Sequence, residues 1–383
     1  MLIHGTFITL TPFHSSAFGG GFVCTDEGRL IQGSTAQGKP ATVTAKQSVF
    51  ADGIELAGVP FYPGNALRGL LRREARALIQ SVTGQKNSLP VYHGMSCGAV
   101  TGKPASGSSV DLEYLSRARQ HVFAGLFGGG PEMIASAYTV GDLLPVIAPL
   151  VSGEGAQTRP IPAEFGAVAL ARATDEGSEF IRNPWLLTEI KHFLRVDDIL
   201  RMNIRNLDES IEDFEEQAVA WLIRIAANKA ARAAVDSQMA SMAGKKRVKG
   251  EAAVVPEKVS KEAISAMTAV EVVKAGVPFY FRATVDGTEA QAGLLLMALA
   301  GYINRQKMGG MTRLGFGRFY PDLVLEQDGV VIGNAMEYTD GKWVPHSVHA
   351  APYLDAAMEA ISSITNEEMA SIYFEASSKD ESD

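Results

Sequence analysis

The sequence predicts an α+β fold with the element order βαββαβ, which is that of a ferredoxin-like or RNA-recognition domain. Three observations carry this prediction. Short apolar runs typical of strands occur at residues 2–11, 134–149, 268–284 and 319–325. Amphipathic helices are expected at about residues 66–79 and 289–306, between these runs. The remaining stretches are long, so they are expected to be insertions into this domain.

The first strand and helix are separated by an irregular stretch. Residues 11–56 are rich in glycine and have few periodic apolar positions, which is typical of a functional loop. Asn65 is expected to cap a helix that begins at about Ala66, after the sequence Pro63-Gly64. One apolar stripe runs along this helix and consists of Leu67, Leu70, Leu71, Ala75, Leu78 and Ile79.

The middle of the chain is expected to hold two further insertions. The first covers residues 84–110 and is followed by a helix over 111–127. The β-branched run at 134–149 should then form a central strand or a strand pair. The second insertion covers residues 153–268, and it contains an alanine-rich helix expected at about 217–242.

The core elements resume after this excursion. Residues 268–284 alternate as a strand or hairpin would, and residues 289–306 form the second core helix. A glycine-rich stretch leads from this helix into a strand at Phe319–Leu325. The chain ends with a helix at about 350–364 and an acidic tail that is expected to be disordered.

Composition excludes several classes of protein. The net charge of −8 argues against a strongly basic, nonspecific nucleic-acid binder, but it leaves room for a basic groove on an acidic protein. No apolar run reaches 18 residues and no charged leader precedes an apolar one, so neither a membrane span nor a signal peptide is expected. Cys24 and Cys97 are the only cysteines, which fits a reducing cytoplasm. We predict no metal site and no cofactor.

The glycine-rich stretch is a candidate phosphate site. Residues 308–319 read Met-Gly-Gly-Met-Thr-Arg-Leu-Gly-Phe-Gly-Arg-Phe. Glycines such as Gly310, Gly315 and Gly317 let the backbone come close to a ligand, and its free N–H groups suit an anion. Arg313 and Arg318 would add positive charge. The alternative is a tight turn between a helix and an edge strand.

Two other basic stretches are candidates for anion binding. Asn65, Arg68 and Arg72 are expected near a helix N-terminus, where free N–H groups and the helix dipole favour anions. A solvated basic face is the alternative for these residues. The second stretch is Gly244–Gly250, where Lys245, Lys246 and Arg247 give dense positive charge, although such runs are usually solvated tips.

Three stretches together resemble the repeat-associated (RAMP) CRISPR proteins. Residues 61–72 read Phe-Tyr-Pro-Gly-Asn-Ala-Leu-Arg-Gly-Leu-Leu-Arg and resemble the P-G-S-S-L-K-G-x-x-R signature of that superfamily. Residues 123–128 resemble its h-F-G element, and Gly315-Phe-Gly-Arg318 matches the G-x-G-R core of its C-terminal loop. Within the superfamily the chain is similar to the hand-shaped backbone subunit, most of all that of the type IV systems, with type III next.

The resemblance implies a single domain over residues 1–383. Its ferredoxin-like palm would comprise about 1–11, 57–150 and 268–335, with finger-like insertions at 12–56 and 84–110, a thumb and helical insertion at 153–267, and the C-terminal helix and acidic tail at 350–383.

The resemblance also implies partners. Such a subunit binds CRISPR RNA independently of sequence, forms a helical filament with other copies of itself, and presents the guide to a target DNA or RNA strand among other effector-complex subunits. It would act in the prokaryotic cytoplasm without a membrane. The expected RNA-binding residues are Asn65, Arg68, Arg72, Gly310, Arg313, Gly315, Gly317, Arg318, His14, Ser15, Lys245, Lys246 and Arg247.

Catalysis is not expected. Type III backbone subunits cut target RNA with an aspartate in a G-G-x-D-like context, whereas Asp26 follows the glycines of the first loop by five positions. His14 with Ser15 could act as an acid/base pair, as in other RAMP ribonucleases, but no second base lies nearby in the sequence. Cleavage of the target or guide RNA is therefore the alternative function.

A nucleotide-binding enzyme is the third hypothesis. It is disfavoured because the glycine-rich stretch follows a helix and precedes a strand, which is the reverse of a dinucleotide site.

Overall fold

A computed structural model describes residues 1–17, 21–25, 29–33, 39–51, 54–98, 112–130, 134–146, 187–196 and 264–373, with the isolated positions 223, 227, 230, 233, 234 and 237. The chain divides into two compact units. The first unit comprises Met1–Ala17, Thr44–Glu189 and Val272–Asp383, and the second comprises Phe18–Val43 and Ile190–Glu271.

The first unit is built on a sheet that, within the described residues, has six strands. β1 (Leu2–Thr9) lies between β11 (Pro278–Val285) and β12 (Phe319–Gln327) and pairs with both in antiparallel fashion. β7 (Tyr138–Val140) and β8 (Leu144–Pro145) pair with β11, and β13 (Val330–Asn334) pairs with β12. The order β12-β1-β11-β7 places the fourth, first, third and second strands of the predicted βαββαβ series side by side. The predicted α+β class is therefore confirmed, and the strand order is that of two interleaved β-α-β units.

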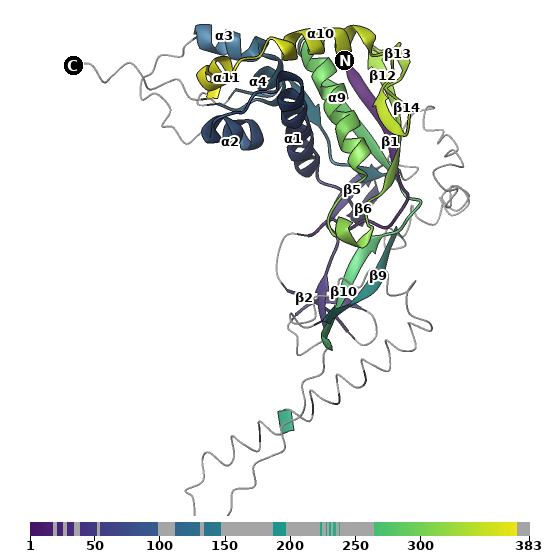
Figure 1. Ribbon diagram of the computed structural model, residues 1–383. Helices are drawn as coiled ribbons and strands as arrows, with labels where there is room; N and C mark the ends of the chain where they lie inside the picture. Colours follow the sequence, from purple (N-terminus) through teal and green to yellow (C-terminus); the bar gives the residue numbers. More distant parts are fainter. Residues whose placement is uncertain are drawn as a thin grey trace, which may run out of the picture. The chain divides into compact units, whose positions relative to one another are not determined.

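Two helices lie on one face of this sheet, as Figure 1 shows: α1 (Gly64–Thr83) and α9 (Glu289–Arg305). The core between the layers is aromatic. The Phe7 ring of β1 lies 4.8 Å from Phe319 and 5.0 Å from Phe281, centroid to centroid, and Tyr302 of α9 stacks on Phe319 at 5.4 Å. These side chains are fully buried. Aromatic burial of this size anchors α9 to the sheet.

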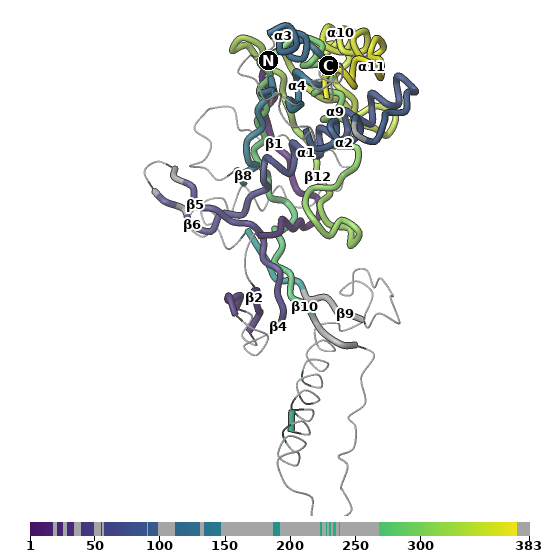
Figure 2. The backbone as a smooth tube through the Cα atoms, turned by 90° about the vertical axis from the view of Figure 1, so that its left-hand side faces the viewer, coloured from purple at the N-terminus to yellow at the C-terminus, as the bar shows by residue number. Residues whose placement is uncertain are grey.

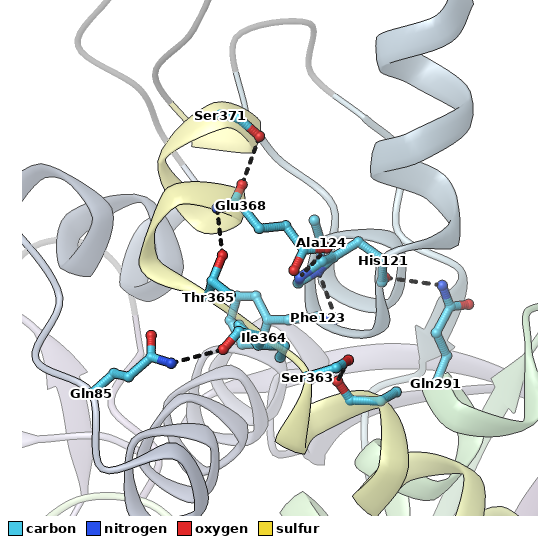
Figure 3. Close-up of polar contacts among 11 residues, drawn as sticks. Gln85, His121, Phe123, Ala124, Gln291, Ser363, Ile364, Thr365, Glu368 and Ser371 are labelled. Carbon is cyan, nitrogen blue, oxygen red and sulfur yellow. Dashed lines mark hydrogen bonds and ion pairs between the residues drawn. The ribbon is translucent and has the colours of Figure 1, made fainter.

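The helix predicted over residues 111–127 is two helices, α3 (Leu112–Gln120) and α4 (Val122–Phe127). His121 separates them, because its Nδ1 accepts hydrogen bonds from Phe123 N at 3.1 Å and Ala124 N at 3.0 Å (Figure 3). This imidazole serves as the N-cap of α4 and satisfies two of its free N–H groups. Gln291 of α9 donates to Arg119 O and His121 O, and these bonds hold the junction of α3 and α4 against the core.

The expectation of an irregular loop over residues 11–56 is wrong. β2 (Phe22–Cys24), β3 (Leu30–Gln32) and β4 (Lys39–Thr42) form a sheet in the second unit with β9 (Thr188–Val196) and β10 (Ile264–Val273), in the order β3-β2-β4-β10-β9. β5 (Lys46–Ala51) and β6 (Ile54–Pro60) belong to the first unit and form a two-stranded arm (Figure 2). Most of these strands are too short to show alternation in the sequence.

The sheets also correct two strand predictions. Residues 268–284 are not a hairpin, because β10 and β11 belong to different sheets. The run at 134–149 supplies β7 and β8 beside β11, at the edge of the sheet rather than at its centre.

The remaining described elements surround the core of the first unit. α2 (Leu89–Cys97) lies in the predicted 84–110 insertion. The predicted C-terminal helix is confirmed as α10 (Ala351–Ser362), whereas the hairpin of β14 (Met336–Thr339) and β15 (Lys342–Pro345) and the last helix, α11 (Asn366–Tyr373), were not predicted. Among the described helices none is long and apolar enough to cross a membrane. Because α11 follows residue 364, the expectation that the chain is disordered from there on is wrong as far as residue 373. The rest of the predicted acidic tail lies outside the described residues.

Candidate nucleic-acid interface

The glycine-rich loop between α9 and β12 is held against the segment that follows β1. Gly310 N donates to His14 O at 2.6 Å and Gly317 N donates to Pro12 O at 2.9 Å. Met308 N closes the loop by donating to Gly317 O at 2.8 Å. The loop is therefore a fixed part of the fold and not a free hinge.

Two glycines are required by this packing. Gly309 and Gly317 have φ of 79° and 82°, in the left-handed region that favours glycine. A Cβ on Gly309 would collide with His14 O, and one on Gly317 would collide with Met308 O. These two positions are thus explained by close backbone approach within the protein.

The amide groups of Gly310, Gly315 and Gly317 are not available for phosphate, contrary to expectation. Gly310 N and Gly317 N are used by the contacts described above, and Gly315 N donates to Thr312 O at 3.2 Å. What the loop presents outward is its side chains. Arg313 and Arg318 are both exposed, as are Gly310 and Gly315. A Cβ on Gly315 would meet nothing within 4 Å, so the space beside this glycine is open.

His14 and Ser15 are buried, at 1% and 6% exposure. The His14 imidazole lies between Ser16 Oγ at 3.1 Å and Thr44 Oγ1 at 3.3 Å. Ala45 N donates to Ser15 O at 2.6 Å, which ties the same segment to the start of β5. The burial of His14 and Ser15 argues against their predicted contact with RNA, because a phosphate of the polymer cannot reach their side chains.

The start of α1 differs from the expected anion site. Pro63 occupies the N-cap, and Asn65 lies exposed within the first turn, so the prediction that Asn65 caps the helix is wrong. Gly64 N donates to Asp142 Oδ1 at 2.7 Å. A carboxylate at a helix N-terminus occupies the place that a phosphate would take.

Arg68 lies one turn further along α1 and is half-buried. Its Nη2 donates to Ser136 Oγ at 3.1 Å, and its guanidinium lies 5.6 Å from the centre of the Tyr138 ring. It lines an open cleft of about 390 Å³ together with Arg72 and Ser136. Arg68 therefore remains accessible to an anion from this cleft.

Arg72 is nine-tenths buried and its guanidinium is surrounded by protein acceptors. Nε donates to Met95 O at 2.7 Å and Nη2 to Gly94 O at 3.1 Å, both in the last turn of α2. Nη1 donates to Phe127 O at 3.1 Å and Nη2 to Gly128 O at 3.0 Å, at the end of α4. A cation is favourable at the negative end of a helix dipole, and here one cation serves two helices. Arg72 thus organises three helices, and this argues against its predicted role as a phosphate ligand.

Tyr62 connects the glycine-rich loop with the start of α1. Burial raises the pKa of its phenol, an effect opposed by a hydrogen bond with the Gly309 backbone, by the Tyr302 hydroxyl and by the charge of Arg73. Tyr62 N also donates to Leu143 O at 3.0 Å, beside β8. The structure therefore brings the loop and the first turn of α1 together through a residue that was not predicted to matter.

Several predicted residues lie outside the described part of the chain. These are Lys245, Lys246, Arg247 and Asp26. Within the described residues no three His, Cys, Asp or Glu side chains gather as they would around a metal ion.

Sequence reasoning missed Tyr62, Asp142 and Thr44. Asp142 follows the edge strand β7, in a Gly-Asp pair that a turn would equally explain. Thr44 and Tyr62 act through contacts with segments distant in sequence, so no local pattern marks them.

Comparisons with known proteins place this arrangement in a family. A family model described as the RAMP superfamily matches residues 6–320. No curated protein matches the chain. Among solved structures, a chain from a "Type IV-B CRISPR Complex" is similar at 15% sequence identity, with a TM-score of 0.42, over 86% of this chain and 93% of the other.

Proposed function

The chain belongs to the RAMP superfamily, and we propose that it is a non-catalytic, RNA-binding backbone subunit of a type IV-like CRISPR effector complex. One observation supports this proposal most directly. Arg313 and Arg318 are exposed on a loop whose backbone is held on both sides by hydrogen bonds. Two exposed cations on a fixed backbone, with open space beside Gly315, suit contact with the phosphates of one strand.

Binding through these arginines is independent of sequence. Phosphate contacts position a nucleic acid without reading its bases, and a subunit that accepts any guide needs this property. Arg68 extends the basic surface toward the cleft beside α1. Asn65 is exposed one turn before Arg68 and can add a hydrogen bond. We propose that the guide RNA follows this path from the glycine-rich loop to the start of α1.

The partners follow from this role. The protein would associate with further copies of itself along the guide and with other effector-complex subunits, in the cytoplasm of a prokaryote. Pairing of the guide with a DNA or RNA target would take place on the assembled filament. The basic residues Lys245, Lys246 and Arg247 are proposed to add salt-sensitive contacts with the nucleic acid.

Ribonuclease activity is the second candidate function. It is less well supported, because the His14 imidazole is buried between two hydroxyl groups. A general base must come within hydrogen-bond reach of the proton that it removes from the substrate.

Purification from cells that transcribe a guide tests the proposed function. We expect RNA of uniform length to co-purify with a series of oligomers. A bound mononucleotide in place of RNA would support a nucleotide-binding enzyme.

Incubation with labelled guide and target strands then tests for cutting. We expect both strands to stay intact, with Asp26→Ala and His14→Ala as matched variants. Cleavage by the wild-type protein that either variant abolishes would replace this proposal with a ribonuclease.

A further inference from the structure

The outer strand of the central sheet exposes apolar side chains on both of its faces. Val330, Val331 and Ile332 of β13 are 66%, 55% and 37% exposed. Successive strand residues point to opposite faces, so three exposed neighbours mean that nothing covers either side. Val348 is 72% exposed, and its neighbour His349 contacts Asn334 O of β13 through Nδ1 at 3.1 Å. We call these four residues, Val330, Val331, Ile332 and Val348, the edge patch.

The edge patch is unsuited to the addition of another strand. The pairing of β12 with β13 shifts register between Leu325 and Glu326, which marks a β-bulge. Bulges interrupt the regular ladder of an edge and so discourage strand addition. The patch therefore offers its side chains, and an exposed apolar cluster of this kind marks a contact surface.

Acidic groups surround the edge patch. Asp328 is exposed in the turn between β12 and β13, and Glu326 and Glu337 are half-buried on neighbouring strands. The pKa of the nearby Tyr353 phenol is raised, first by burial and then by the negative charges of Glu289 and Asp328.

A second apolar surface of opposite charge lies on α2. Leu89 and Tyr92 are 80% and 41% exposed, and we call them the α2 patch. The Arg76 guanidinium lies 4.0 Å from the centre of the Tyr92 ring, and the exposed Lys86 precedes Leu89 by three residues. Two cations thus border the α2 patch.

One carboxylate also lies close to the α2 patch. Asn366 Nδ2 donates to Lys86 O, which brings the exposed Glu367 near. The border of the α2 patch therefore remains net positive.

The two patches cannot meet within one molecule. β13 is the outer strand beside β12, whereas α2 packs on α1 and α11, over the β7 side of the sheet. Figure 1 shows β13 and α2 on opposite sides of the first unit. Two different, complementary surfaces on one protein produce head-to-tail contacts, and such contacts propagate when they do not close into a ring.

We propose that the edge patch of one copy docks on the α2 patch of the next copy. This inference rests on the proposed function and names the surfaces of the assembly proposed there. Aliphatic side chains of β13 would pack on Leu89 and Tyr92, while Asp328 would lie near Arg76 of α1.

Two variants that each damage one surface test this docking. Val331→Glu damages the edge patch and Leu89→Glu the α2 patch, and both positions are exposed enough to leave folding intact. The matched control is Leu112→Glu, because Leu112 is 75% exposed on α3 and belongs to neither patch. The readout is particle mass by mass photometry, with protein alone and on a guide-length RNA.

We expect each damaged variant alone to lose all RNA-free oligomers, whereas the control retains them. A mixture of the two variants should give dimers and nothing larger, because only one intact edge patch and one intact α2 patch remain to pair. Raising the salt concentration should weaken this dimer.

Three outcomes would overturn the inference. They are unchanged oligomers in either variant, a mixture that stays monomeric, and a wild-type protein that never associates with or without RNA. A wild-type protein that forms oligomers but binds no RNA would instead contradict the proposed function and leave the docking intact.

Discussion

Arg72 of α1 and the two arginines of the glycine-rich loop look alike in sequence but have different roles. Both follow glycines, and both were predicted to bind phosphate. In the structure Arg72 is buried and donates hydrogen bonds to carbonyl oxygens at the ends of α2 and α4. Arg313 and Arg318 are exposed on a loop in which the amides of Gly310, Gly315 and Gly317 are already bonded. The difference teaches that an arginine is free for a ligand only where the fold leaves its donors unused.

The largest expected effect comes from removal of Arg72. Arg72→Ala leaves buried carbonyls at two helix ends without a donor, and each such loss costs about 1–3 kcal/mol. We expect the free energy of unfolding to fall by about 3 kcal/mol or more, measured by urea denaturation. Arg73→Ala is the control, since Arg73 is exposed, and it should change stability by less than about 0.5 kcal/mol. Equal effects of the two variants would remove the structural role assigned to Arg72.

The glycines of the loop sharpen the comparison. Gly317→Ala introduces a Cβ that collides with Met308 O, and Gly315→Ala adds a Cβ that meets nothing within 4 Å. Both residues have positive φ, at 82° and 84°, so both variants bear a left-handed penalty of about 1–2 kcal/mol. Gly317→Ala should cost at least about 1 kcal/mol more than Gly315→Ala, because overpacking adds to that penalty. Thermal unfolding measures the difference, and a larger loss in Gly315→Ala would contradict the described loop.

His121, at the N-terminus of α4, makes the stability of the protein depend on pH. Burial lowers the pKa of His121 from 6.5 to about 4. The unfolded chain therefore binds more protons between these two values, so stability is complete above pH 6.5 and falls as the pH drops toward 4. Nδ1 cannot take a proton while it accepts from Phe123 N and Ala124 N, and Glu368 Oε1 lies 3.8 Å from Nε2 (Figure 3).

His121→Asn isolates this contribution. Asparagine keeps an acceptor for the N-cap and does not titrate in this range. Between pH 6.5 and pH 5, the free energy of unfolding of the wild type should fall by on the order of 1–2 kcal/mol more than that of the variant. Denaturation at each pH measures both changes. Parallel pH curves for the two proteins would show that His121 is not buried as a neutral group.

The sequence was sufficient to predict the core strands and helices, but not the short strands outside the core. β1, α9 and β12 are long and regular, so periodicity located them well. β2 and β3 have three residues each and are stabilised by pairing partners that are distant in the sequence, which no local pattern can reveal.

The candidate site shows the same limit. Motif order pointed to the glycine-rich loop and to α1, but the use of each arginine depends on tertiary contacts. Arg72 is saturated by carbonyls from α2 and α4, and Asp142 fills the N-terminus of α1 from across the fold. These contacts join residues at least twenty positions apart, so spacing alone could not assign them.

Salt dependence of RNA binding tests the central claim most directly. Each phosphate contact with a single strand contributes about 0.7 to the slope of log K against log salt concentration. The Arg313→Ala, Arg318→Ala double variant should therefore lower the magnitude of the slope by about 1.4, with weaker binding and unchanged stability. The control is Arg119→Ala on α3, which is exposed away from the loop. An unchanged slope and affinity in the double variant would contradict the assignment of the loop to RNA.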